Sequence, residues 1–279
     1  MVEFRDHLYM IDCGEGAQLQ FRHMHIHFAK LRAIFISHLH GDHCFGLLGL
    51  ISTLGMLGRT APLHVYAPAD FEHLFNTMLA FFCDRMEYKV EFHAVDTTRQ
   101  EVIFESKSLA VSTIPLEHRI PCCGYLFSEK PSLPHIRRDM IDYYEIPVSQ
   151  INNVKNGMDW TTPEGDVIPN SRLVTPADKP RKYAFCSDTR YMPRLHQSVM
   201  GVDTLYHEST YSAENAERAK LYYHSTARQA AQVAKAAQVG KLILGHYSAR
   251  YNDEKGLLEE AKAVFPNSFL SSEGAVFEV

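Results

Sequence analysis

One short stretch limits what this chain can fold into more than any other. An apolar run at Ala33–Ile36, expected to form a buried strand, is followed almost at once by the pattern H-x-H-x-D-H. Imidazole nitrogens and carboxylate oxygens in a dense set are the ligands that zinc prefers. His38 and His40 alternate and can share one metal ion, whereas Asp42 and His43 lie past a glycine and can reach a second. A histidine-rich surface loop is the alternative, but the apolar strand in front of the pattern argues against it.

The glycine in this pattern, Gly41, is expected to take backbone angles that bring its neighbours to one point. Four donors cannot complete two coordination spheres, so further ligands must come from elsewhere in the sequence. Three residues qualify because each follows an apolar strand-like run: His118, Asp188 and His246. Any one of them alone would be an ordinary residue at the end of a strand. Together with the H-x-H-x-D-H pattern, they predict a dinuclear metal site.

Short apolar runs alternate with helical patterns along the chain, which predicts an α/β fold. The 279 residues are 46% hydrophobic, so the chain can bury a sizeable core. The expected strands are 34–36, 63–66, 102–104, 109–114, 183–185, 204–206 and 242–244. The expected helices are 45–57, 69–82, 226–239 and 256–264.

The proline-rich stretch 130–180 differs from the rest, because it has little periodicity and holds the only tryptophan, Trp160. Such a segment inside a compact domain is more often functional than part of the core. We therefore expect residues 1–279 to form one domain in which 130–180 is an inserted arm or exosite-like segment.

Charge and cysteine usage indicate the setting in which the protein works. A net charge of −5 argues mildly against a nucleic-acid partner. A local basic patch would suffice, however, and bound zinc adds positive charge that the sequence does not show. The six cysteines form no C-x-x-C pair, which is typical of a reducing compartment. With no apolar run of about 20 residues and no signal peptide at the start, we expect a cytoplasmic protein without a membrane partner.

The motifs, taken together, resemble the metallo-β-lactamase superfamily and, within it, the ribonuclease Z family, which removes 3′ trailers from precursor tRNA. The likeness covers about residues 8–251, and the paired H-E-x-T and H-S-T strings favour an RNA nuclease over a lactonase or thioesterase. Besides H-x-H-x-D-H, the matching strings are D-C-G-E-G at 12–16, H-R-I-P at 118–121, S-D-T-R at 187–190, H-E-S-T at 207–210, H-S-T at 224–226 and H-Y-S-A-R-Y at 246–251.

This resemblance implies an αββα sandwich, in which two mixed β-sheets are flanked by helices, with the family's amino-terminal strand apparently missing here. It also implies two zinc ions per subunit and a homodimer. The implied metal ligands are His38, His40 and His118 on one ion, Asp42, His43 and His246 on the other, and Asp188 bridging the two.

The implied reaction is attack on a phosphodiester by a water activated between the metals. Asp42 is the candidate to accept the proton of that water, besides serving as a ligand. Glu208 and His224 are the candidates to protonate the departing 3′-oxygen, since a carboxylate beside an imidazole raises its pKa and fixes its tautomer. The alternative for His224 is that it merely precedes the alanine-rich helix, with Ser225 as the cap. Arg250 is a candidate for contact with a substrate phosphate.

Two rival functions remain open. The first is a dinuclear zinc hydrolase of the same fold that acts on a small ester or phosphodiester. The lack of the family's Gly-Pro pair in 130–180 favours it, whereas Glu208, His224 and Arg250 argue against it. The second is a non-catalytic RNA-binding relative, which should have lost a ligand, although all seven are present. A further histidine run at 23–27 has no accompanying carboxylate and is expected to be a surface segment.

Overall fold

The computed structural model describes all of residues 1–279 and divides them into two compact units. The larger unit contains Met1–Phe104, Val111–Phe127 and Lys182–Val279. The smaller unit contains Glu105–Ala110 and Ser128–Arg181. None of the helices combines the length and the apolar character that crossing a membrane would need.

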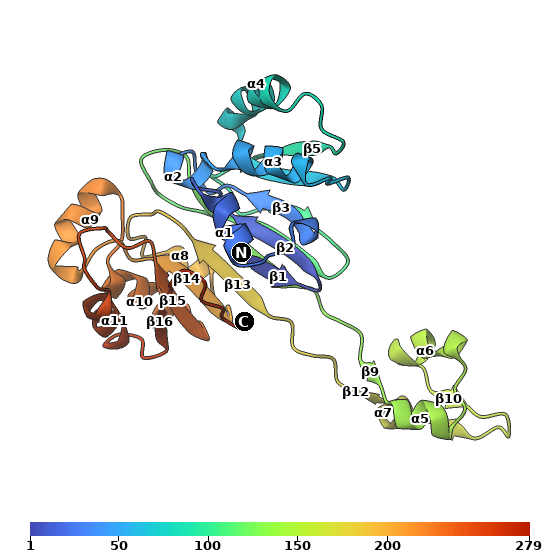
Figure 1. Ribbon diagram of the computed structural model, residues 1–279. Coiled ribbons are helices and arrows are strands. Elements are labelled where there is room, and N and C mark those ends of the chain that lie inside the picture. The colour runs from blue at the N-terminus through green and yellow to red at the C-terminus, as the bar shows by residue number, and fades with distance from the viewer. The chain divides into compact units, whose positions relative to one another are not determined.

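The first sheet has five strands in the order β1-β2-β3-β4-β5 (Figure 1). β1 and β2 pair antiparallel, and the remaining neighbours pair parallel, so the sheet is mixed. The short strand β1 thus forms one edge, and β5 forms the other. The strands are β1 (Val2–Phe4), β2 (His7–Ile11), β3 (Leu31–Phe35), β4 (Leu63–Pro68) and β5 (Val90–Val95).

The second sheet has seven strands in the order β16-β15-β14-β13-β8-β7-β6. Its members are β6 (Val102–Glu105), β7 (Leu109–Pro115), β8 (Cys123–Glu129), β13 (Lys182–Cys186), β14 (Thr204–Glu208), β15 (Lys241–Gly245) and β16 (Ser268–Leu270). The strands β13 to β16 pair parallel, with Cys186 opposite His207 and Glu208 opposite Gly245. Because neighbouring parallel strands end at the same edge, the residues that follow β13, β14 and β15 meet there.

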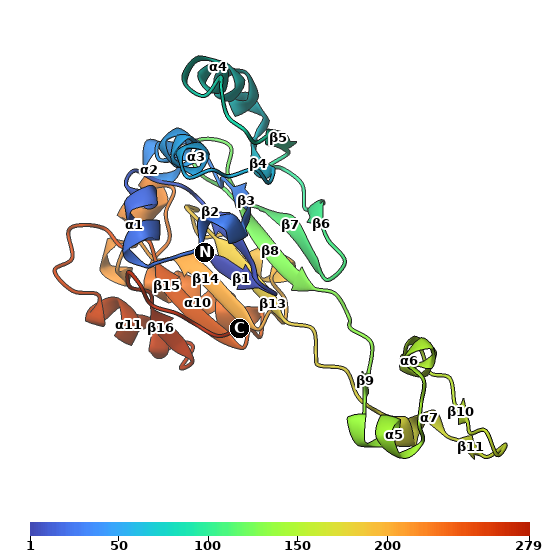
Figure 2. The same cartoon turned by 45° about the vertical axis from the view of Figure 1, so that its right-hand side comes forward.

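Helices accompany both sheets, as Figures 1 and 2 show. Beside the first sheet lie α1 (Ala17–His23), α2 (Gly41–Cys44), α3 (Leu47–Met56), η2 (Ala69–Phe71) and α4 (Glu72–Phe82), with the short η1 (Phe28–Lys30) leading into β3. Beside the second lie α8 (Leu195–Ser198), η3 (Ala213–Asn215), α9 (Ala216–Tyr222), α10 (Ala227–Ala236) and α11 (Lys255–Lys262). In the first group, Leu50 and Ile51 of α3 pack with Ile34 and Val65 in one buried apolar cluster. Alanines of α10 pack with Leu205 and Leu242 in another.

Aromatic side chains fill the space between the two sheets. The Phe35 ring is fully buried, and its centroid lies 5.2 Å from that of Tyr125 and 5.5 Å from that of Phe127. Tyr9 makes an edge contact with Phe104, at 5.5 Å between ring centroids. The layers are therefore helix, sheet, sheet and helix, and the αββα sandwich with two mixed sheets is confirmed.

The apolar stretch expected as one helix over 45–57 forms the single helix α3, at Leu47–Met56. One local detail needs correction. Ser225 does not cap α10: Thr226 does, because its side chain accepts from the Gln229 amide while the Gln229 side chain accepts from the Thr226 amide. This capping box leaves Ser225 to donate to the Thr189 carbonyl instead.

The smaller unit has a hydrophobic core of its own, in which Ile146, Val154, Ile168 and Leu173 are buried. The Trp160 indole donates to the Tyr144 carbonyl. The elements are β9 (His135–Ile136), α5 (Arg138–Tyr143), α6 (Val148–Lys155), β10 (Trp160–Thr161), β11 (Val167–Ile168), α7 (Asn170–Leu173) and β12 (Val174–Thr175). The segment is thus more regular than its sequence indicated, and its role as an inserted arm stays a prediction.

The buried aromatic layer generates a stability prediction. Phe35→Ala removes a fully buried ring that contacts both sheets, and we expect the free energy of unfolding to fall by about 3–5 kcal/mol in chemical denaturation. Phe81→Ala is the matched control, because Phe81 is 79% exposed and should change stability by less than about 0.5 kcal/mol. Equal losses in the two variants would contradict the assignment of the core.

Candidate metal centre

The structure brings all seven predicted metal-binding side chains together at one edge of the larger unit. They fall into two groups, each with ligand atoms within 4.8 Å of one another. The first group is His38, His40, His118 and Asp188, and the second is Asp42, His43 and His246. Each arises where a strand has just ended: β3 precedes the histidine pattern, β7 precedes His118, β13 precedes Asp188 and β15 precedes His246.

In the first group, three ring nitrogens face a common point. His38 Nε2 lies 3.0 Å from His40 Nδ1, and His118 Nε2 lies 3.3 Å from the same nitrogen. His38 and the His118 side chain are buried, so these nitrogens face one another away from solvent. Burial, followed by the neighbouring histidines, lowers the pKa of His38 to about 2. A neutral imidazole is the form that binds a metal ion.

In the second group, His43 is buried and Asp42 is exposed. His43 Nε2 lies 3.5 Å from Asp42 Oδ2, and 72% of the Asp42 side chain is accessible. His246 completes the group from the end of β15. This group therefore sits nearer to solvent than the first and leaves a carboxylate open to an incoming substrate.

Asp188 lies between the two groups, with one oxygen toward each. Its Oδ2 is 3.8 Å from His38 Nε2 and 3.9 Å from His118 Nε2. Its Oδ1 is 3.6 Å from His43 Nε2 and 3.2 Å from His246 Nε2. This is the arrangement that a carboxylate bridging two ions would need.

These spacings fit zinc. With zinc–nitrogen bonds of 2.0–2.1 Å in a tetrahedron, neighbouring ligand atoms lie about 3.3 Å apart. Both groups contain such contacts, and all donors are nitrogen or carboxylate oxygen. The residues present therefore suit two metal ions.

Asp12 holds the histidine pattern in place through hydrogen bonds on the side away from the other candidate ligands. Its carboxylate accepts from the Ser37 amide at 2.7 Å, from the Ser37 hydroxyl at 2.9 Å and from His43 Nδ1 at 2.8 Å. Burial lowers the pKa of His43, but Asp12 and the other carboxylates outweigh burial and raise it to about 9. Since the outer nitrogen of His43 is held by Asp12, its Nε2 faces the site in a fixed orientation.

The outer nitrogens of two more ligands have partners as well. His118 Nδ1 donates to the Tyr223 carbonyl at 2.9 Å, and His246 Nδ1 donates to the Thr210 hydroxyl at 2.8 Å. His246 has φ of +56°, and Asp12 has the same value. Left-handed backbone is uncommon for residues other than glycine, and at these two positions the surrounding hydrogen bonds hold it in place.

Gly14 and Gly41 each allow a neighbouring group to lie closer to the backbone than a side chain would permit. Gly41 is not among the residues with positive φ, so the backbone reason that we gave for it is wrong. A Cβ on Gly41 would instead lie 2.4 Å from the Phe45 ring. A Cβ on Gly14 would lie 2.2 Å from the Asp42 carbonyl oxygen, so this glycine lets the D-C-G-E-G turn pack against the metal loop.

Glu208 and His224 form the pair that the sequence predicted. Glu208 is fully buried, and its Oε1 accepts from His224 Nδ1 at 2.9 Å and from the Thr189 amide at 3.0 Å. Its Oε2 accepts from the amide and the hydroxyl of Thr210, at 3.0 and 2.7 Å. Burial raises the pKa of Glu208, but the His224 and Thr210 hydrogen bonds outweigh burial and hold it below its ordinary value.

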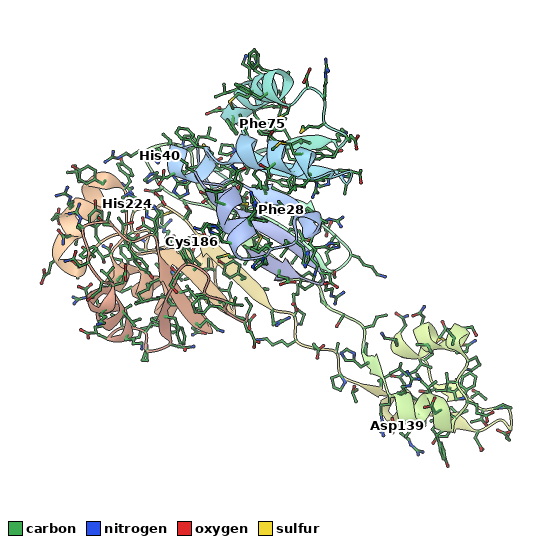
Figure 3. The ribbon with its side chains drawn as sticks, viewed as in Figure 1. Phe28, His40, Phe75, Asp139, Cys186 and His224 are labelled. Atoms are coloured by element: carbon green, nitrogen blue, oxygen red, sulfur yellow. The ribbon has the colours of Figure 1, made fainter.

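The ring of His224 lies next to the metal centre. It stacks on His246, with 5.4 Å between centroids, and lies 5.2 Å from the His118 ring. Figure 3 shows the labelled His40 and His224 near each other, although they are far apart in sequence. Burial lowers the pKa of His224, but the Glu208 carboxylate outweighs burial and raises it above its ordinary value. The pair thus favours a protonated imidazole beside the site.

Arginines near the site rest on tyrosine rings. Arg250 lies 5.0 Å from the ring of Tyr211, which itself contacts His224. Arg119 and Arg218 lie 4.8 and 5.4 Å from the Tyr222 ring. These contacts hold guanidinium groups in place without neutralising them.

Sequence reasoning assigned no role to Asp12, although it follows β2 just as the predicted ligands follow their strands. It also missed Thr210, whose contacts depend on the folded arrangement of β14 and β15. His23, His25 and His27 do not join any group of potential ligands, in line with a surface segment.

Comparisons with known proteins agree with this geometry. A family model described as anti-Pycsar protein Apyc1 matches residues 1–133. A ribonuclease Z of Bacteroides fragilis is 56% identical over 98% of this chain and 90% of its own length. A ribonuclease Z of Porphyromonas gingivalis is 50% identical, again over 98% of this chain and 90% of its own length.

Solved structures show the same fold at low identity. The human short-form tRNase Z has a TM-score of 0.67 at 22% identity, covering 99% of this chain and 90% of that protein. The metallo-β-lactamase fold protein YhfI of Bacillus subtilis has a TM-score of 0.66 at 16% identity, covering 99% and 88%. By its identity to full-length relatives, the chain belongs to the ribonuclease Z family, a group of metal-dependent endoribonucleases within the metallo-β-lactamase fold.

Proposed function

We propose that this protein is a zinc-dependent endoribonuclease that removes the 3′ trailer from precursor tRNA. The observation that carries the proposal is the Glu208–His224 pair beside a seven-ligand metal centre, since it adds a proton donor to the two-ion site. Membership of the ribonuclease Z family supports the substrate class, and the human neighbour is itself named a tRNase.

The proposed centre holds two zinc ions per subunit. His38, His40 and His118 would bind one ion, Asp42, His43 and His246 the other, and Asp188 both. Bound zinc lowers the pKa of a coordinated water to about 7 and withdraws charge from phosphate oxygens. Asp42 is proposed to accept a proton as well, because it is the most exposed carboxylate of the centre.

His224 is proposed to give the departing 3′-oxygen its proton. Its Nδ1 is held by Glu208, so the proton available to the substrate is on Nε2. Glu208 stays ionised because Thr189 and Thr210 donate to it, and it therefore stabilises the charged imidazole.

The RNA backbone is proposed to contact arginines around the centre. Arg250 is exposed, and Tyr211 joins it to His224, which suits contact with a phosphate next to the cleaved bond. The segment 137–173 has four Lys or Arg against six Asp or Glu, so this segment is not a basic patch.

We propose that this segment is an inserted arm that adds contacts to tRNA. We also propose that the protein works as a cytoplasmic homodimer.

The second candidate function is hydrolysis of a small ester or phosphodiester by the same centre. The absence of a Gly-Pro pair in 130–180 favours it. The fold is shared with proteins of other names, such as a diphosphatase at a TM-score of 0.60 and 16% identity.

Cleavage of a 3′-extended tRNA with end mapping separates the two candidates. We expect one major cut directly after the discriminator base in the presence of zinc or manganese, because the site combines a two-ion centre with a proton donor. An intact tRNA, alongside hydrolysis of bis(p-nitrophenyl) phosphate, would instead establish the small-substrate function.

Substitution of the proton-donating pair tests its role. Glu208→Gln and His224→Asn should each lower kcat by about 10²–10⁴-fold, the usual contribution of general acid catalysis. Bound zinc, measured by mass spectrometry, should stay at the wild-type number of ions per chain. Glu217→Gln, on the exposed side of α9, is the matched control and should behave as wild type. Loss of zinc from the His224 variant would make it a ligand rather than an acid.

The paired strands β9 and β12 allow a clean removal of the arm. Ile136 is opposite Val174, so residues 137–173 can be replaced by an Asn-Gly turn that closes a hairpin. We expect KM for precursor tRNA to rise about tenfold, equivalent to about 1.4 kcal/mol of lost contact. Hydrolysis of bis(p-nitrophenyl) phosphate should be unchanged. An unaltered KM for tRNA would remove the arm from the binding proposal.

A further inference from the structure

A second group of potential ligands lies on the first sheet, away from the seven residues of the centre. It consists of His64 on β4 and of Glu91 and His93 on β5. His64 is opposite Glu91 in the parallel register, and Tyr66 is opposite His93. Since side chains two residues apart on a strand share a face, all three ligands project from the same side of the sheet.

The donor atoms of this group converge. His64 Nδ1 lies 3.1 Å from His93 Nε2 and 3.3 Å from Glu91 Oε2, and all three atoms lie within 4.8 Å of one another. These spacings are close to the roughly 3.3 Å between neighbouring ligands in tetrahedral zinc. Two strands of one sheet supply the ligands, so the arrangement is held by backbone pairing.

Neighbouring side chains hold the ligands in this orientation. The Tyr66 ring stacks on His93, with 4.4 Å between centroids and 11° between planes. Lys89 pairs with Glu91 Oε1 at 2.9 Å, which leaves Oε2 toward the histidines.

This group is separate from the catalytic centre. The centre lies beyond the carboxyl ends of the strands, whereas His64 and Glu91 are the second residues of their strands. The side chains of His64 and Glu91 are 27% and 28% exposed, so an ion has access to them from solvent. The proposed cleavage uses none of these residues.

We propose that His64, Glu91 and His93 form a third zinc site, which links β4 to the edge strand β5. Two imidazoles and one carboxylate are a known zinc ligand set, and they leave a position for water. An ion here would stabilise the sheet edge, because it binds the folded arrangement of two strands and not the unfolded chain. The competing explanation is that the three side chains only share hydrogen bonds.

Zinc content tests the proposal directly. Wild type and the double variant His64→Gln/His93→Gln, both as the metal-loaded enzyme, are equilibrated at the same buffered micromolar free zinc and analysed by mass spectrometry. We expect the double variant to hold one zinc ion fewer per chain, with tRNA cleavage unchanged. Affinity at this site should fall at least about a hundredfold, since even removal of an outer partner of a metal ligand costs 10–100-fold.

Two further variants keep the test decisive. His73→Gln removes an exposed histidine of α4 and should retain the zinc content of wild type. Glu91→Gln changes only one partly exposed ligand, so this variant replaces the double variant in the test if the double variant fails to fold. We expect Glu91→Gln to lose the extra zinc ion as well. Added zinc should raise the Tm of wild type but not of the His64 and His93 variant. Equal zinc content in wild type, the double variant and Glu91→Gln would overturn the proposal.

Discussion

Everything at this centre depends on Asp188, a carboxylate that is almost fully buried and faces imidazoles on both sides. A buried charge is costly unless positive charge or hydrogen bonds compensate it. The Ser187 hydroxyl donates a hydrogen bond to Asp188 Oδ1 at 3.4 Å, which is too long to compensate the charge of the carboxylate by itself. Four ring nitrogens lie within 3.2–3.9 Å of its two oxygens, which is where cations bound by those rings would be placed. The buried carboxylate and the four rings around it are therefore consistent with a metal centre.

The sequence predicted the parts of the site that depend on local order. The histidine pattern lies in one loop, and His118, Asp188 and His246 each follow a strand whose apolar run is visible in the sequence. Contacts between distant segments could not be predicted in this way. Asp12 reaches His43 because β2 lies beside β3, and His64 meets Glu91 only through the register of β4 and β5. The error at Gly41 has the same origin, since the feature that distinguishes this glycine is its close contact with the Phe45 ring, which depends on how the chain folds.

The fold was predictable for a related reason. Strands and helices follow from hydrophobic periodicity, which each segment carries in itself. Boundaries depended on finer chemistry: the capping box of Thr226 and Gln229, rather than Ser225, decides where α10 begins. In 130–180 the apolar residues are too few and too irregular to show a pattern. Ile146, Val154 and Leu173 nonetheless gather into a small core, because turns and short helices bring them together.

Thr210 connects His246, a proposed metal ligand, to Glu208 of the proposed proton-donating pair. Its hydroxyl accepts from His246 Nδ1 and donates to Glu208 Oε2, while the other oxygen of Glu208 accepts from His224. A single hydroxyl has one proton to donate, so its orientation toward Glu208 requires that His246 carry its proton on Nδ1. That tautomer leaves the lone pair of His246 Nε2 free on the side that faces Asp188, where the second metal ion is proposed to bind. The ionised Glu208 thus influences the protonation of two histidines at once: it favours the His246 tautomer that the proposed metal ligand needs, and it stabilises the protonated His224 that the proposed proton donor needs.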